Sequence, residues 1–94
     1  MKFKDEISVD KSVKSIHFTK RKSVELHIGN MYYVSFGENM AHPCKLIDID
    51  EERGEITVSS YIINRGKELE TTNILFKDEI GLTPEEAVIN CVTM

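Results

Sequence analysis

The sequence predicts a mainly β domain, a small antiparallel barrel or sandwich that ends in a short helix. Four consecutive segments have strand patterns and are joined by short turns, with no long helix pattern between them. These segments are residues 31–36, 43–49, 55–63 and 67–76. Strands of this length at regular spacing are typical of small antiparallel β folds. A helix start signal at Thr83 predicts the last element.

The length and composition fit one folded domain. The chain has 94 residues, so we expect a single domain over residues 1–94, with residues 1–10 loosely ordered or forming an edge strand. With 40% hydrophobic and 30% charged residues, the composition is that of an ordinary soluble protein. No apolar run approaches the roughly 20 residues that span a bilayer, and the N-terminus is charged where a signal peptide is apolar. We therefore expect a cytoplasmic protein that binds no membrane, with no disulfide between Cys44 and Cys91.

The segment before the four strands also shows strand alternation. Residues 13–19 and 24–28 each alternate apolar and polar side chains, which predicts a hairpin with a basic turn at residues 20–22. Gly29 and Asn30 then break the strand. Residues 37–42 read as a loop. Pro43 has no N–H to donate, so we expect it to begin the next strand.

The register of the central hairpin follows from its apolar residues. If residues 51–54 form the loop, Ile49 lies opposite Ile56 and Ile47 lies opposite Val58. These four side chains would then share one buried face, because a shift of one residue turns every side chain to the other face. Gly54 would supply the positive φ at the end of the loop.

Two further elements are predicted from local signals. Arg65 and Gly66 read as a two-residue turn, which places Ile62 opposite Leu69 and Ile63 opposite Glu68. The motif Thr83-Pro-Glu-Glu86 matches a helix N-cap with proline at the first helical position and glutamate three residues after the cap. The helix should pack on the sheet through Val88 and Val92.

No catalytic or metal-binding set is visible in the sequence. The nucleotide-binding, hydrolase and metalloprotease motifs are absent. His42 and Cys44 fall on the same side of a strand, but zinc needs three or four ligands and no further ligand pair follows. We therefore expect a protein that is not an enzyme and needs no cofactor or metal.

Exposed aromatic residues predict a protein-binding surface. Tyr32 and Tyr33 are adjacent, so one of them faces outward if they lie in a strand, and Tyr61 falls on the outward side of its own strand. Met40 and His42 belong to the neighbouring 37–42 loop. Aromatic side chains anchor many protein interfaces. A protein partner or a homodimer is the first hypothesis.

A basic segment supports a second hypothesis, nucleic-acid binding. Its candidate contacts are Lys14, Lys20, Arg21 and Lys22, which lie near His17 and Phe18. Bases interleaved with aromatic residues can bind phosphates and stack on nucleobases. The formal net charge of −4 opposes a general role of this kind, because an acidic domain repels polyanions.

The arrangement from residue 28 to residue 76 resembles small SH3-like barrels, the group that includes the Tudor and KOW modules. The resemblance rests on Gly29 before a strand, the loop before Pro43, the acidic hairpin and the strand that follows. It implies an SH3-like antiparallel barrel with a short C-terminal helix. The chain has no tryptophan, so the ligands of these modules are not transferred to its residues. The alternative fold is α+β, with a curved antiparallel sheet covered by the helix.

Overall fold

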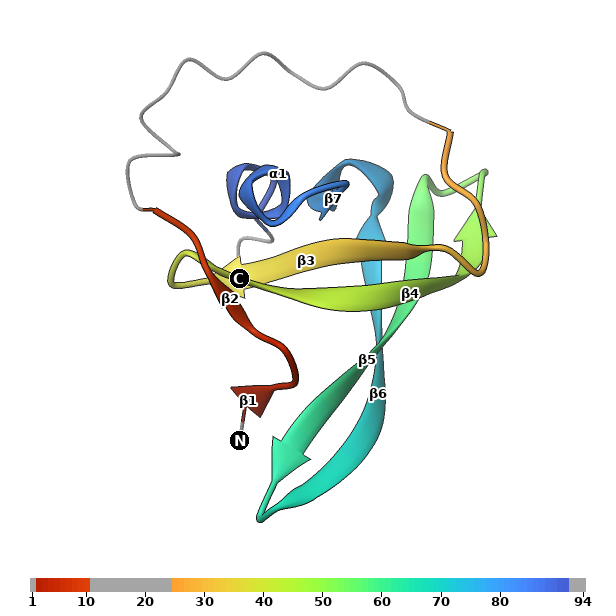
Figure 1. Cartoon of the computed structure of the whole chain (residues 1–94). Coiled ribbons are helices and arrows are strands. Elements are labelled where there is room, and N and C mark those ends of the chain that lie inside the picture. The colour runs from red at the N-terminus through yellow and green to blue at the C-terminus, as the bar shows by residue number, and fades with distance from the viewer. Residues whose placement is uncertain (1, 11–24, 92–94) are drawn as a thin grey trace.

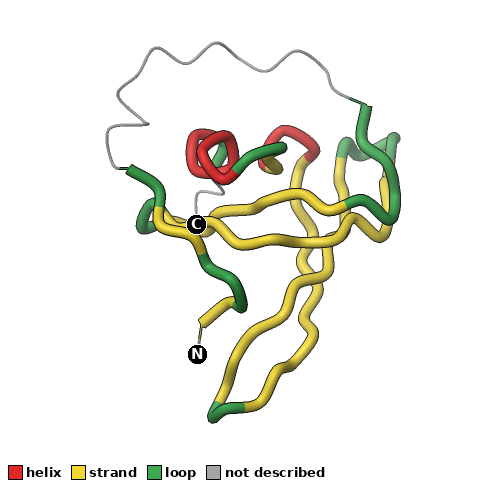
Figure 2. The backbone as a smooth tube through the Cα atoms, in the orientation of Figure 1, coloured by secondary structure: helices red, strands yellow, loops and turns green. Residues whose placement is uncertain are grey.

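The computed structural model describes residues 2–10 and 25–91, and this part of the chain is mainly β (Figure 1). It contains seven strands, a 3₁₀ turn at Lys77–Glu79 and one short α-helix. Figure 2 shows the helical, strand and loop segments along the backbone. The elements are β1 (Lys2–Phe3), β2 (Ile7–Ser8), β3 (Met31–Gly37), β4 (Met40–Asp50), β5 (Glu55–Asn64), β6 (Lys67–Phe76), β7 (Ile80–Gly81) and α1 (Pro84–Ile89).

The strands form one antiparallel sheet with the order β1-β5-β4-β3-β7, while β2 pairs with β4 and β6 pairs with β5. The described strands do not close on themselves, so they form an open sheet, and the predicted barrel is not confirmed. Helix α1 packs on β3, β4 and β7. The β5–β6 hairpin extends away from the helix toward the bottom of Figure 1.

Two clusters of buried side chains lie on opposite faces of the β3–β4 pair. This follows from strand alternation, since Tyr32 and Val34 belong to one cluster while Tyr33 packs against the other. The larger cluster contains Tyr32, Val34, Cys44, Leu46, Ile56, Val58, Leu75 and Ile80. The smaller cluster lies beneath α1 and contains Val9, Ala41, Ala87 and Val88.

The register of the central hairpin was predicted correctly at its tip and wrongly further along. Asp50 pairs with Glu55 around the 51–54 loop, and Ile49 pairs with Ile56. A β-bulge then interrupts the ladder, and Val58 pairs with Leu46 instead of Ile47. Ile47 is the extra residue of the bulge and is 40% exposed. The buried face expected for Ile47 is therefore wrong.

Two-residue turns join β3 to β4 and β5 to β6. Arg65 and Gly66 both have positive φ, as a type I′ turn requires, and the predicted pairs Ile62–Leu69 and Ile63–Glu68 are confirmed. Glu38 and Asn39 also have positive φ. The predicted loop over residues 37–42 is therefore wrong, because a tight turn closes at Asn39 and β4 begins at Met40.

Pro43 lies inside β4, opposite Tyr33, and does not begin the strand. The main chain of Leu46 bonds to Gly29 and Asn30 on the β3 side. Because main-chain groups alternate along a strand, the nitrogen of Pro43 faces the other edge of β4. The ladder between β4 and β5 ends at the Lys45–Ser59 pair, and the carbonyl oxygen of Tyr61, the next position along β5, accepts its hydrogen bond from the N–H of Lys4 (2.8 Å). The missing N–H of Pro43 therefore leaves no ladder bond unmade.

The predicted helix cap is confirmed. The Oγ1 atom of Thr83 accepts a hydrogen bond from the N–H of Glu86 (3.1 Å), and Pro84 occupies the first helical position. Val88 is buried against the sheet. Val92 lies outside the described residues.

The N-terminal residues form two short edge strands, in line with one of the two alternatives for residues 1–10. β1 pairs with β5, and β2 pairs with β4. Residues 25–28 form no strand, so that part of the predicted first hairpin is wrong, while residues 13–19 and Val24 lie outside the described part. Cys44 and Cys91 are not joined in a disulfide. No helix in the described ranges has the length and apolar character needed to cross a bilayer.

Candidate functional site

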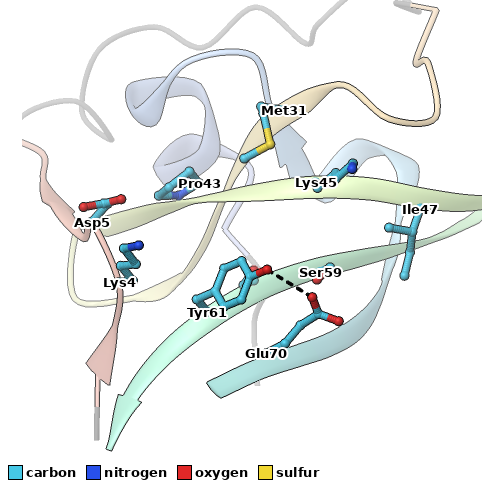
Figure 3. Close-up of a pocket in the computed structure, with 10 residues that line it drawn as sticks. Lys4, Asp5, Met31, Pro43, Lys45, Ile47, Ser59, Tyr61 and Glu70 are labelled. Carbon is cyan, nitrogen blue, oxygen red and sulfur yellow. Dashed lines mark hydrogen bonds between the residues drawn. The ribbon is translucent and has the colours of Figure 1, made fainter. Parts of the chain in front are cut away.

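A groove of about 320 Å³ opens on the sheet where β4 and β5 separate (Figure 3). We call it the β4–β5 groove. It is lined by Lys4, Asp5, Met31, Pro43, Lys45, Ile47, Ser59, Ser60, Tyr61 and Glu70. Met31 pairs with Lys45 and Lys45 pairs with Ser59, so these three side chains lie in a row across the sheet. The row faces away from the larger core cluster, to which Tyr32, Cys44 and Val58 belong.

Four of the ten lining residues supply apolar surface to the groove, and the other six are charged or polar. Met31 is 61% exposed, and Tyr61 is 45% exposed. Ile47 reaches the groove because the bulge turns it outward, and Pro43 supplies a further apolar wall. Covering such surface from water is favourable by about 25 cal/mol for each Å². The groove therefore favours an apolar ligand group.

Polar groups hold the aromatic ring in place. The hydroxyl of Tyr61 donates a hydrogen bond to Oε2 of Glu70 (3.2 Å), its cross-strand partner. This bond to the carboxylate, together with its charge, raises the pKa of Tyr61. The ammonium of Lys4 lies 6.0 Å from the ring centroid and pairs with Glu68 at 2.9 Å. The ring therefore stands between a carboxylate and a cation.

The structure separates the predicted aromatic residues. Tyr61 lines the groove as an exposed side chain. Tyr32 is buried in the larger core cluster, and its hydroxyl accepts a hydrogen bond from the N–H of His27 (2.9 Å). Tyr33 is half-buried against the smaller cluster. Tyr33 therefore lies on the face of β3 opposite Tyr32, as alternation predicted, but it is only partly exposed because it packs beside α1.

Met40 and His42 also lie away from the groove. Met40 is half-buried in β4 and pairs with Ser8 of β2. His42 is buried, and its ring stacks on Phe3 at a centroid distance of 3.6 Å. The ring of Phe36 lies 5.7 Å from His42. His42 is therefore a core side chain and not a surface contact, since the N-terminal strand covers it.

Burial shifts the pKa of His42 and of Cys44, the two side chains considered above for metal binding. It lowers the pKa of His42 to about 4 and raises the pKa of Cys44 to about 12. The Nε2 atom of His42 is buried and has no hydrogen-bond partner among residues 2–10 and 25–91. Within residues 2–10 and 25–91, no group of three His, Cys, Asp or Glu side chains could hold a metal ion.

Sequence reasoning missed three walls of the groove, namely Met31, Pro43 and Ile47. Val34 and Tyr32 face the core, so strand alternation would have predicted that Met31 faces the opposite side of β3. Its cross-strand partner Lys45 faces that side too. No local signal marks the bulge that exposes Ile47. The basic candidates Lys14, Lys20, Arg21 and Lys22 lie outside the described residues.

The chain was compared with family models, with curated proteins and with solved structures, and none of them matches it. No relative therefore assigns a role to any residue of the β4–β5 groove. The case for a binding site at this position depends on the burial, distances and charges of the residues described above.

Proposed function

We propose that this protein is a non-catalytic protein-interaction module, a subunit of a larger assembly, that binds an apolar side chain of its partner in the β4–β5 groove. The observation that carries the proposal is the exposed Tyr61 ring, fixed by Glu70 beside the apolar walls of Met31 and Ile47. Tyrosine and methionine are enriched in the buried centres of protein interfaces.

The fixed ring lowers the entropic cost of binding. A side chain that is already held loses little freedom when a partner covers it, and this cost is about 0.5 to 1.5 kcal/mol for a mobile side chain. Anchors of this type commonly contribute over about 2 kcal/mol to an interface. The net charge of −4 favours a protein partner over a polyanion.

The test is capture of partners from a lysate of the source cells, followed by mass spectrometry. The Tyr61→Ala and Met31→Ala variants should lose a partner that the unmodified protein retains. Leu69→Ala is the matched control, because Leu69 is 45% exposed like Tyr61 but does not line the groove. Retention of every partner by both groove variants would contradict the proposal. Light scattering on the unmodified protein would identify a homodimer as the partner.

The alternative, nucleic-acid binding, is carried by the basic residues between Lys11 and Lys22. Binding through these side chains should weaken steeply as salt rises, because each phosphate contact releases counterions. Contacts with the apolar walls of the groove should respond little to salt. If Lys20→Glu with Arg21→Glu abolishes binding to RNA or DNA while the groove variants change nothing, nucleic acid is the partner.

For the fold, we infer a relation to SH3-like barrels. The support is the run of four consecutive antiparallel strands, β3 to β6, joined by turns of two, four and two residues. The described sheet is open, so a barrel would require further pairing. An experimental structure of the complete chain would test this relation.

A further inference from the structure

The outer edge of β6 has the properties of a strand-binding site. All ten residues of β6 pair with β5 without a register shift. Proteins usually protect such an edge with charged side chains, a bulge, a proline or a covering element. β6 contains no bulge or proline, its charged residues are confined to the Lys67–Glu70 end, and no strand in the described ranges lies on its other side.

The alternation of main-chain groups identifies which residues face this edge. Lys77 donates its N–H to the carbonyl oxygen of Gly54, and Lys67 closes the hairpin opposite Asn64. Odd-numbered residues of β6 therefore bond to β5. The N–H and C=O groups of the even-numbered residues face outward, and these residues are Glu68, Glu70, Thr72, Ile74 and Phe76. The N–H of Phe76 is already bound by Oε1 of Glu79 (2.8 Å), so the open donors end at Ile74.

The even-numbered residues of β6 form an apolar end and an acidic end of the strand. Ile74 and Phe76 are 68% and 56% exposed at one end of β6, while Glu68 and Glu70 occupy the other end. They stand on the face that carries the β4–β5 groove, since Glu70 pairs with the groove residue Tyr61. Within the described ranges the Glu70 carboxylate accepts a bond from the neutral hydroxyl of Tyr61, whereas Glu68 pairs with Lys4 at 2.9 Å, so a cation would find uncompensated charge at Glu70 and would share Glu68 with Lys4.

The division of β6 into an apolar end and an acidic end disfavours pairing with the β6 strand of a second copy of the chain. Two antiparallel β6 strands centred on Thr72 would place Glu70 beside Ile74 and Glu68 beside Phe76 of the other copy. Centring the pair on Glu70 would bring two carboxylates together, which is destabilising. Centring it on Ile74 would need the N–H of Phe76, which Glu79 already accepts.

We propose that the β6 edge binds an extended segment of a different protein as an additional antiparallel strand. This inference rests on the proposed protein-binding function and names the partner's chemistry. In an antiparallel strand of nine residues, the first and third would face Phe76 and Ile74 and are apolar. The seventh and ninth would face Glu70 and Glu68 and are lysine or arginine. Main-chain bonds to β6 supply affinity, and the alternate side chains supply specificity.

The test uses a fluorescent nine-residue peptide with isoleucine at positions one and three and lysine at positions seven and nine. Its binding to the full chain is measured by anisotropy, beside a control peptide that has glutamate at positions seven and nine. The lysine peptide should bind at least about tenfold more tightly than the glutamate peptide, because like charges beside Glu70 oppose binding. No binding of the lysine peptide, or equal binding of both peptides, would overturn the proposal.

Two measurements separate the edge from the groove. Thr72→Pro removes one outward N–H and should weaken peptide binding by about tenfold. In case this variant unfolds, amide exchange on the unmodified protein is the second readout. The peptide should slow exchange at Glu70, Thr72 and Ile74, and should leave Thr71 and Asn73 unchanged. Unchanged exchange at all five amides would overturn the edge proposal. If Tyr61→Ala loses the cellular partner but Thr72→Pro keeps it, the groove function stands and the edge proposal falls.

Discussion

Acidification should destabilise this protein through His42. The imidazole is buried and stacked on Phe3, and its Nε2 atom has no hydrogen-bond partner in the described part of the chain. Burial penalises the charged form, so the pKa of His42 falls from its usual 6.5 to about 4 in the folded protein. The unfolded chain binds the proton more readily than the folded chain. Folding stability is therefore fully present above pH 6.5 and is lost as the pH falls from 6.5 toward 4.

The size of the effect follows from the two pKa values. The gap between 6.5 and about 4 corresponds to roughly 3 kcal/mol, since one pKa unit is about 1.4 kcal/mol. Glu6 and Glu38 line the small cavity that His42 also lines, and their carboxylates would offset part of the penalty on a charged ring. The figure of roughly 3 kcal/mol is therefore an upper value.

Urea unfolding at a series of pH values between 7.5 and 4 tests this prediction. The His42→Phe variant is the control, because it keeps an aromatic ring in the stack and cannot titrate. The unmodified protein should lose more stability than His42→Phe across this range, by up to roughly 3 kcal/mol. Parallel curves for the two proteins would refute the reasoning, as would an NMR titration of His42 in the folded protein with a midpoint near 6.5.

Four substitutions test the packing. Thr83→Ala should cost about 1 kcal/mol of unfolding free energy in thermal melts, because it removes the helix cap. Gly81→Ala should cost about 2 to 3 kcal/mol, since a Cβ atom there would lie 2.3 Å from the backbone nitrogen of Ala87. In urea titrations Val58→Ala should cost about 2 kcal/mol while Ile47→Ala costs under about 1 kcal/mol, because only Val58 is fully buried. An equal loss of stability for Val58→Ala and Ile47→Ala would argue against the bulge. An unchanged unfolding midpoint for Thr83→Ala or Gly81→Ala would contradict the prediction for that variant.

Local signals in the sequence were sufficient for the features that depend on neighbouring residues. Arg65 and Gly66 fix the β5–β6 register, because a two-residue turn leaves one way to pair the flanking strands. The cap at Thr83 also depends only on the residues that follow it. The alternation of side chains along β5 correctly predicted that Tyr61 is exposed.

The remaining features depend on contacts between distant segments. Tyr32 is buried because β5, β6 and β7 complete the core over it, and Tyr33 is covered by α1. His42 is buried because Phe3, from the opposite end of the sequence, stacks on its ring. Alternation assigns a side chain to a face of a strand, but it does not say which element covers that face.

The bulge at Ile47 makes this residue unnecessary for the sheet itself. Leu46 pairs with Val58, and Asp48 pairs with the adjacent Thr57. A chain that lacked Ile47 could therefore keep every other pair of the β4–β5 ladder in an unbroken register. The sheet would lose no partner, while the groove would lose one wall. Residue 47 is thus a position where the shape of the proposed binding groove can change with little effect on folding, and length variation there would alter the groove before it altered the fold.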